Sequence, residues 1–259
     1  MFGHLHLAFE FYDYLLIFVV TALGTFSAYL HDPQLKAVTA TVPIPFGFAY
    51  IAIGLPIGAA NAGGALLCLL YVHVVRILTY KAHLPIILSI AVGIFIFVIL
   101  GAFLLPLCPE GEGFFFFVCA INFVLGLILF QTQTYEPGKH YKTPIPVYIK
   151  APVVALVITG LMVVKKIMGG FATSFPMMNS VVSYESRHSL GDQCRQLPLF
   201  LIAAPVMWIS MRYAETIGKL NHWVVLAIGV TLYMIIFWPL NQELKRRIKA
   251  TATESTHPI

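Results

Sequence analysis

Apolar runs long enough to cross a lipid bilayer recur along almost the whole chain. The hydrocarbon core of a bilayer is about 30 Å thick, and a helix needs about 20 mostly apolar residues to span it. A helix also satisfies its own backbone hydrogen bonds, which the absence of water in lipid requires. We therefore predict an all-α fold, a polytopic transmembrane helical bundle of about nine spans. The predicted segments are residues 11–30, 35–55, 63–78, 84–107, 114–131, 147–164, 171–184, 197–213 and 222–240.

The low content of charged residues leaves little room for a domain outside the membrane. Charged residues make up 10% of the chain and hydrophobic residues 59%, whereas about 25% of the residues of a soluble domain are charged. Short loops and no folded ectodomain are expected, which excludes most nucleic-acid-binding proteins. The expected partners are a small-molecule solute and membrane lipids, with no nucleic acid, and a homo-oligomer is compatible with the sequence.

The distribution of basic residues predicts an orientation. Arg76, Lys81, Lys139, Lys142 and the cluster at 245–249 all fall on one side if the chain crosses nine times. Basic loops stay in the cytoplasm, so we predict the cell inner (plasma) membrane of a bacterium, with the N-terminus outside and the C-terminus cytoplasmic. The acidic loop at 109–112 then lies outside, while Lys165 and Lys166 break the rule.

The chain contains a weak internal repeat at an offset of about 133 residues. Thr41, Val42 and Pro43 correspond to Ser174, Phe175 and Pro176, and Pro106 corresponds to Pro239. A single connector helix between two four-helix units forces the second unit to insert upside down, as in many secondary transporters. We therefore predict an inverted-topology repeat. Its parts are a first four-helix unit (1–110), a connector helix with a basic cytoplasmic loop (111–144), a second four-helix unit (145–244) and a basic tail (245–259).

Each half also resembles the GlpM-like proteins, a family of small bacterial membrane proteins of about four spans. The resemblance rests on residues 42–46 (Val-Pro-Ile-Pro-Phe) and 83–86 (His-Leu-Pro-Ile) in the first half. In the second half it rests more loosely on Phe175-Pro176, with no proline to match Pro85. The resemblance implies the four-span architecture of each half and carries no activity.

The most polar stretch inside an apolar segment is 173–188, and it predicts a binding site. Asn179 and Ser183 are four residues apart on a helix and can point at one target, and Pro176 frees a backbone carbonyl. Ionisable groups at membrane depth usually mark a solute or proton path, but residues 185–196 could instead form a solvated loop. The predicted substrate-binding residues are Thr41, Pro43, Pro45, Ser174, Pro176, Asn179, Ser183, Arg187 and Arg195. The predicted proton-coupling residues are Glu185, His188 and His73.

Several of these residues have a structural alternative. His73 suits a packed, hydrogen-bonded histidine as well as a proton relay, and Lys150 suits an interfacial anchor better than a substrate ligand. The glycine-rich stretch 54–64 suits a tightly packed hairpin as well as a broken helix that binds an ion.

These features favour a secondary transporter or facilitator for a small anionic or zwitterionic solute, with or without proton coupling. Two alternatives stay open: a membrane-embedded enzyme acting on a lipid or lipid-linked substrate, with Glu185, His188 and Asp192 as its acid/base groups, and a non-catalytic membrane scaffold. Catalysis is the less favoured option because no enzyme motif is present. The four cysteines have no metal-ligand spacing, so we predict neither a metal nor a cofactor.

Overall fold

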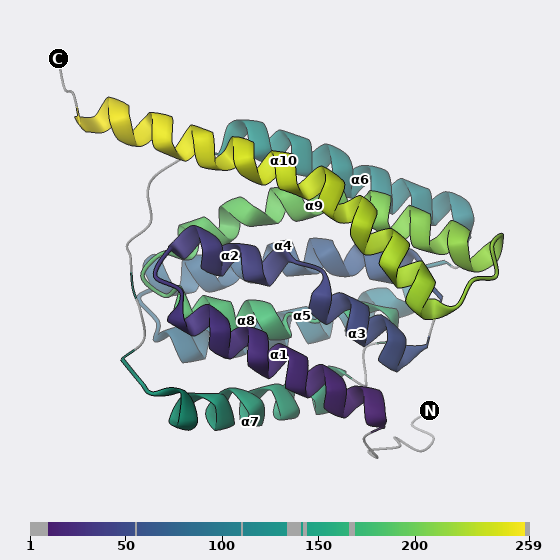
Figure 1. Cartoon of the computed structure of the whole chain (residues 1–259), viewed down its shortest axis with the longest axis horizontal. Helices are drawn as coiled ribbons and strands as arrows, with labels where there is room; N and C mark the ends of the chain where they lie inside the picture. The colour runs from purple at the N-terminus through teal and green to yellow at the C-terminus, as the bar shows by residue number, and fades with distance from the viewer. Residues whose placement is uncertain are drawn as a thin grey trace.

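The computed structural model describes residues 10–54, 56–109, 111–133, 141, 144–165 and 169–256. All regular structure in these residues is helical (Figure 1). Glu110, Lys139 and Lys142, which contributed to the predicted orientation, lie outside the described residues. The elements are α1 (Phe11–Tyr29), α2 (Pro33–Thr41), α3 (Ile44–Ile53), α4 (Ala59–Tyr80), α5 (Ile86–Leu104), η1 (Leu105–Leu107), α6 (Glu112–Thr132), α7 (Val147–Lys165), η2 (Gly169–Ser174), α8 (Met177–Glu185), α9 (Leu190–Thr216) and α10 (His222–Thr256).

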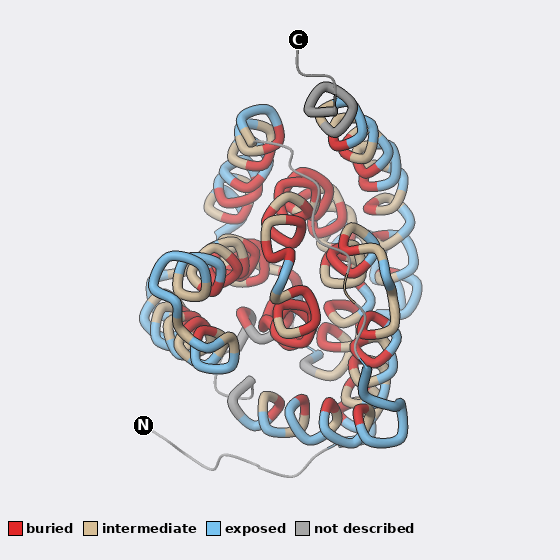
Figure 2. The backbone as a smooth tube through the Cα atoms, turned by 90° about the vertical axis from the view of Figure 1, so that its left-hand side faces the viewer, coloured by how far each residue is buried: buried red, intermediate tan, exposed pale blue. Residues whose placement is uncertain are grey.

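The helices are those of a membrane protein. Among the described residues, seven helical stretches are long and apolar enough to cross a bilayer, with α2 and α3 forming one stretch, and α7 adds a shorter apolar helix. Large apolar side chains face outward, including Phe18, Phe95 and Leu156, which are 65–75% exposed. Exposed residues lie on the outer sides of the peripheral helices and buried ones in the middle (Figure 2). Lipid is the solvent that makes such a surface favourable.

Two of the predicted segments are broken helices, and a proline accounts for each break. Proline has no backbone N–H and disfavours the helical conformation in the residue before it. Val42 is accordingly extended (ψ 128°), and Pro43 starts α3 with φ −78° and ψ 24°. Pro176 starts α8 with φ −78° and ψ 43°, after the 3-10 helix η2. The predicted segment 35–55 is therefore α2 followed by α3, and 171–184 is η2 followed by α8.

The elements pack around a buried centre formed by α4, α8 and α9. α1 lies against α7, α5 lies against α4, and α10 lies against α9, while α6 covers α4 and α9. The broken helices are packed crosswise: α2 contacts α8 and α9, and α3 and α4 contact η2. The closest approach in this region is at Gly64, where an added Cβ would lie 2.6 Å from Cβ of Ser174. Small residues in α4 thus let η2 approach its backbone.

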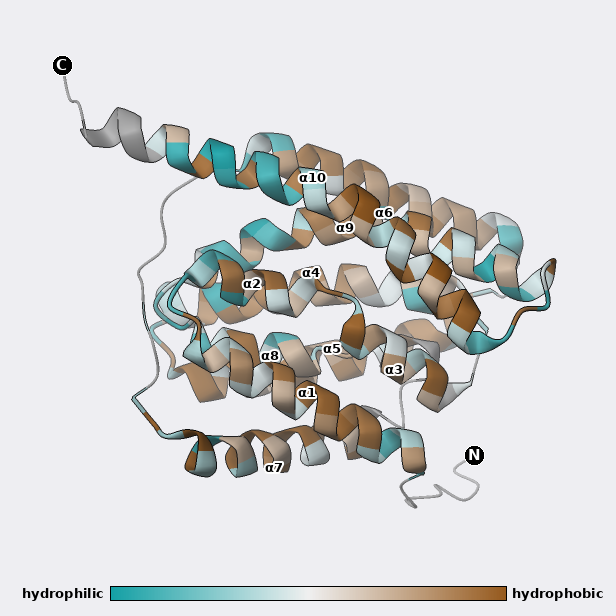
Figure 3. Cartoon of the chain, viewed as in Figure 1, coloured by the Kyte–Doolittle hydropathy of each residue, from teal (hydrophilic) through white to brown (hydrophobic). Residues whose placement is uncertain are grey.

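Two boundaries differ from those predicted. α9 begins at Leu190, seven residues before the predicted start of segment 197–213, and Asp192, Gln193 and Gln196 are buried in it. The solvated loop considered for 185–196 is therefore wrong for most of that stretch. α10 continues beyond residue 240 to Thr256, so the basic residues after 244 extend a helix. Hydrophilic residues gather in these parts of α9 and α10 (Figure 3).

Candidate functional site

A small pocket lies where the two broken helices meet. Its volume is about 50 Å³, enough for roughly three to five water molecules. Thr41, Pro43 and Pro45 line it from the first break, and Ser174 and Asn179 from the second. These are five of the predicted substrate-binding residues, and the fold brings them together from opposite halves of the chain. Phe46, Cys68, Thr173, Phe175, Met178, Leu197 and Phe200 are among the other lining residues.

Polar contacts with α4 hold the second break in place. Asn61 donates a side-chain hydrogen bond to the Thr173 hydroxyl (2.9 Å), and the Ser174 hydroxyl donates to the carbonyl of Asn61 (3.1 Å). The thiol of Cys68 donates to the Ser174 carbonyl (3.0 Å), which the break removes from regular helical bonding. Buried polar groups are costly unless hydrogen-bonded, so this network fixes the backbone at the turn and leaves its groups facing the pocket.

The first break has a simpler anchor. The Thr41 hydroxyl donates to the carbonyl of Val38 within α2 (3.0 Å), and the Thr41 carbonyl accepts from the buried hydroxyl of Tyr233 (2.8 Å). Tyr233 belongs to α10, so the two breaks are tied to different long helices. Around this break the lining is mostly apolar and the polar groups are backbone carbonyls and one hydroxyl.

Asn179 and Ser183 share a target, as their spacing predicts, and the target is a side chain of α9. The amide of Gln193 donates to both oxygens of Asn179, Oδ1 and the carbonyl (3.1 Å each), and the Ser183 hydroxyl donates to Oε1 of Gln193 (2.8 Å). Ser183 is not among the residues that line the pocket. Pro176 starts α8 beside the pocket, and its carbonyl accepts from the Ser180 hydroxyl (2.6 Å).

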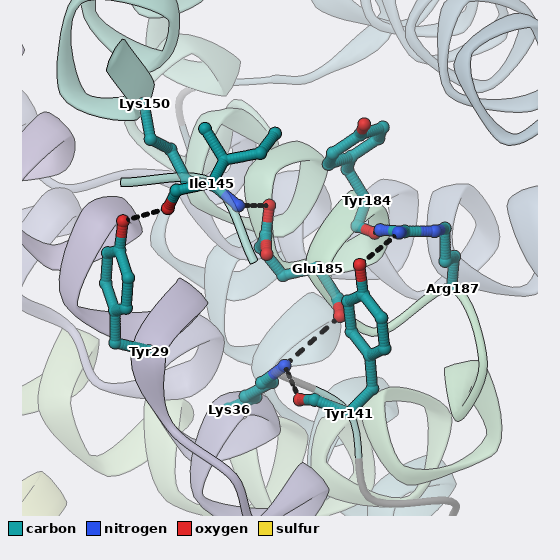
Figure 4. Close-up of polar contacts among 8 residues, drawn as sticks. All are labelled: Tyr29, Lys36, Tyr141, Ile145, Lys150, Tyr184, Glu185 and Arg187. Carbon is teal, nitrogen blue, oxygen red and sulfur yellow. Dashed lines mark hydrogen bonds and ion pairs between the residues drawn. The ribbon is translucent and has the colours of Figure 1, made fainter. Parts of the chain in front are cut away.

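A buried cluster of charges lies at the end of α8 that is remote from the break (Figure 4). Nζ of Lys150 in α7 is 2.6 Å from Oε1 of Glu185, and these side chains are 6% and 1% exposed. Nζ of Lys36 in α2 donates to the carbonyls of Tyr141 (2.6 Å) and Glu185 (3.3 Å). Lys36 is itself 1% exposed.

Arg187 completes the cluster. Its guanidinium donates to the hydroxyl of Tyr141 (2.5 Å) and to the carbonyl of Tyr184 (3.0 Å), and it lies 4.5 Å from the centre of the Tyr141 ring. The cluster thus sets three cationic side chains, Lys36, Lys150 and Arg187, around the single carboxylate of Glu185. An excess of formal positive charge, two of whose three cations are buried, is an environment that favours an anion.

The remaining predicted residues lie outside both groups. Arg195 pairs with Asp192 at 2.7 Å one turn away. The His188 ring is exposed and lies 5.0 Å from the Tyr141 ring. His73 is half-buried, and its Nδ1 lies 2.9 Å from the carbonyl of Leu69, which fits a hydrogen-bonded structural histidine. The described residues contain no group of three or more histidine, cysteine or acidic side chains that could hold a metal ion.

Sequence reasoning missed Lys36 and gave Lys150 a different role. Lys36 falls inside the predicted segment 35–55, where an ionisable residue signals function by default, so that rule could have identified it. Lys150 was interpreted as an interfacial anchor, whereas it is buried against Glu185. Asn61 and Gln193 lie in stretches that the sequence singled out, 54–64 and 185–196, but neither they nor Cys68 were predicted as site residues, because a single polar residue does not reveal its partner.

Comparison with known proteins finds no relative of this chain. No protein-family model matches the chain, and no curated protein or solved structure matches it either. The resemblance to the GlpM-like family therefore stays a prediction. The function has to be argued from the pocket and the charged cluster alone.

Proposed function

We propose that this protein is a secondary transporter or facilitator for a small anionic or zwitterionic solute. The observation that carries the proposal is the meeting of two broken helices, at Pro43 and Pro176, around one small pocket that several polar side chains line. Paired interruptions at corresponding positions of two halves are typical of the solute sites of transporters. Broken helices supply free carbonyls and helix ends to a ligand without a charged side chain in the membrane core.

An inverted repeat is part of the proposal. Pro43 and Pro176 are 133 positions apart and start their helices with the same φ of −78°. The packing supports the same correspondence if α2, α3, α4 and α5 of the first unit correspond to η2, α8, α9 and α10 of the second. The contact of α2 with α8 then corresponds to that of η2 with α3, and the contact of α2 with α9 to that of η2 with α4. The contact of α4 with α5 likewise corresponds to that of α9 with α10. α1 and α7, the first helices of the two units, lie against each other. α6 is then the connector.

We further propose nine crossings, with the N-terminus outside and the C-terminus in the cytoplasm. The start of α1 and the end of α10 lie at opposite ends of the bundle, which fits an odd number of crossings (Figure 1). Seven stretches have the length and hydropathy of spans, and α7 and the pair η2–α8 would be the other two. Arg76, Lys81, Lys150, Arg187 and the basic part of α10 would then share the cytoplasmic side.

The chemistry of the site indicates the solute class. The cluster of Lys36, Lys150 and Arg187 with Glu185 has two more positive than negative charges and would attract an anion to the cytoplasmic end of the route. The 50 Å³ pocket limits what can pass in this conformation to a small solute. Glu185 is our candidate for proton coupling because Oε2 of this buried carboxylate has no hydrogen-bond partner in the described part of the chain.

The two alternative functions are less well supported. A lipid-modifying enzyme needs Glu185 and Asp192 as acid/base groups of one cluster, but the two carboxylates are paired with different cations, Lys150 and Arg195 respectively. A scaffold needs no polar pocket in its interior, whereas Thr41, Ser174 and Asn179 line one. Both arguments favour transport.

Anion flux from proteoliposomes tests the proposal. Vesicles are loaded with the potassium salt of chloride, acetate, phosphate or glutamate. Valinomycin makes them permeable to potassium, and the loss of potassium is followed with an electrode. Charge balance then lets potassium leave only as fast as the anion does. We expect at least one anion to leave about tenfold faster than from protein-free vesicles, a barrier difference of about 1.4 kcal/mol.

Two variants make the flux test specific to the pocket. Asn179→Ala removes an amide that lines the pocket and should reduce the flux severalfold. Thr231→Val is the matched control, because Thr231 is exposed on α10 and its hydroxyl donates to the carbonyl of Ala227 in the same helix. Equal flux through wild type and Asn179→Ala, or no flux of any of the four anions, would count against the proposal.

A further inference from the structure

A second, larger cavity lies on the side of the bundle between α5 and α7, with α8 as its floor. Its volume is about 310 Å³, within the range of small-ligand sites. The walls are almost entirely aliphatic, and several wall residues are also exposed at the surface: Ile87 by 68%, Val153 by 56% and Val157 by 47%. The cavity is therefore a groove that opens sideways toward lipid. Its inner wall includes Ile90, Ile94, Val154, Leu161 and Val181.

One end of this groove is charged and incompletely satisfied. Lys150 and Glu185 line it there, buried to more than nine-tenths and paired with each other. Oε2 of Glu185 has no hydrogen-bond partner among the described residues. The ammonium group of Lys150 has three N–H donors, and its contact with Oε1 of Glu185 does not occupy all of them. The end of the groove thus offers both an acceptor and a cationic donor.

The charged side chains next to the Lys150–Glu185 pair determine which ligand charge the groove favours. Lys36 donates to the carbonyl of Glu185, and Arg187 lies two residues further on. The positive charges of Lys36, Lys150 and Arg187 outnumber the single negative charge of Glu185. A negatively charged group near Lys150 would offset this surplus, whereas a neutral or cationic group would not.

The length of the groove fits one acyl chain. Along α7 it runs from Lys150 to Leu161, a separation of eleven positions, which at 1.5 Å per residue is about 16.5 Å. Half of a bilayer core of about 30 Å is about 15 Å. The groove therefore extends from the charged end of α7 to about the middle of the membrane, which is the depth that one leaflet's acyl chains occupy.

We propose that this groove binds one anionic phospholipid of the phosphatidylglycerol type from the leaflet at the basic end of the bundle. The phosphate contacts Lys150, a head-group hydroxyl donates to Oε2 of Glu185, and one acyl chain lies between α5 and α7. The aliphatic part of this groove is separate from the pocket at Pro43 and Pro176, whereas its charged end shares Lys150 and Glu185 with the cluster at the end of the proposed solute route. Lipid binding is measured without any solute, so its tests are independent of transport.

Binding of defined lipids to the purified, delipidated full-length protein tests the proposal. Native mass spectrometry measures the bound fraction during titration with phosphatidylglycerol or with phosphatidylcholine that has the same acyl chains. We expect phosphatidylglycerol to bind at least about tenfold more tightly, equivalent to about 1.4 kcal/mol. Equal binding of the two lipids to wild-type protein would overturn the proposal.

Two matched variants on α7 locate the site. Val157→Trp fills the aliphatic part of the groove and should abolish the tight binding of phosphatidylglycerol. Leu156→Trp, one residue away, adds the same ring to a side chain that is 75% exposed and does not line the groove, and it should bind as wild type does. Equal losses in both variants would show that the lipid binds elsewhere.

A third variant tests the charged end. Lys150→Met/Glu185→Leu removes both members of the ion pair, so that neither is left buried without a partner. We expect the preference for phosphatidylglycerol over phosphatidylcholine to fall to about twofold or less. A preference that persists unchanged in this variant would overturn the assigned head-group contacts, and the two tryptophan variants decide the question if this one does not fold.

Discussion

The first broken helix, α2–α3, and the second, η2–α8, turn at prolines with nearly the same backbone angles, but the residues around the two turns differ in polarity. Around Pro43 the pocket is mostly apolar, and the carbonyl of Thr41 accepts a hydrogen bond from Tyr233. Around Pro176 the chain carries Thr173 and Ser174, which are bonded to Asn61 in α4. The backbone shape is therefore common to both turns, whereas the polar chemistry belongs mainly to one.

The elements that follow the two turns differ in the same way. α8 ends at Glu185, which is buried against Lys150 and whose carbonyl accepts from Lys36. α3 ends at Ile53 with Gly54 in the left-handed conformation (φ 65°) and has no charged residue along its length. If the halves are repeats, duplication would account for the shape of the pocket, and later divergence would account for a charge cluster at only one end. With this asymmetry, the two ends of the proposed solute route differ in charge.

The largest expected effect is at the charged end of the second broken helix. Glu185→Leu leaves Lys150 buried without its carboxylate, and we expect the free energy of unfolding to fall by about 3–5 kcal/mol. Lys150→Met/Glu185→Leu removes both charges and should recover most of that loss. The measurement is reversible unfolding of the purified protein in mixed detergent micelles. A loss below about 1 kcal/mol for the single variant, the range of exposed ion pairs, would show that the pair is hydrated.

A smaller effect is expected at the contact between α4 and the second turn. An added Cβ at Gly64 would lie 2.6 Å from Cβ of Ser174, so Gly64→Ala should destabilise the fold by about 1–3 kcal/mol. The residue 133 positions after Gly64 is Leu197, which lies beside the first turn. A glycine is therefore required beside the second turn and not beside the first.

Gly160→Ala is the matched control for this substitution. Gly160 is exposed in α7, and an added Cβ there would have no heavy atom within 4 Å. The control should be neutral or stabilising by up to about 1 kcal/mol, because alanine is the better helix former. Equal changes in unfolding free energy for Gly64→Ala and Gly160→Ala would contradict the close approach of η2 to α4.

Much of the fold follows from local sequence signals, but the partners of the polar groups do not. Pro43 and Pro176 are visible in the sequence as residues that disfavour a continuous helix, and Thr41 and Ser174, which precede them, were among the predicted site residues that line one pocket. Lys36 was missed because one lysine barely changes the average hydropathy of a span. The helical run from Leu190 to Gln196 looks like a loop by composition, but two of its polar side chains are buried and bonded to neighbouring helices: Gln193 to α8 and Gln196 to Asn241 of α10.

Side-chain direction was the other limit. Ser183 has the spacing of a ligand beside Asn179, but both bond to Gln193, which comes from a helix that the sequence does not place next to them. Lys150 and Glu185 are 35 positions apart and pair only because α7 and α8 pack together. Helical periodicity tells which residues share a face, and tertiary packing decides what that face meets.

The smallest expected effects compare the two prolines directly. Pro43→Ala and Pro176→Ala each restore a backbone N–H and relieve the restriction on the preceding residue, so each allows its broken helix to straighten. We expect changes in unfolding free energy of about 1 kcal/mol or less, with a severalfold reduction in anion flux from proteoliposomes for both variants. Because both turns line the same pocket, reductions of similar size would mean that the two backbone breaks contribute equally to the route. A reduction confined to Pro176→Ala would instead assign the solute site to the polar second turn, leaving the first turn a packing role, and unchanged flux in both variants would contradict a site at the breaks.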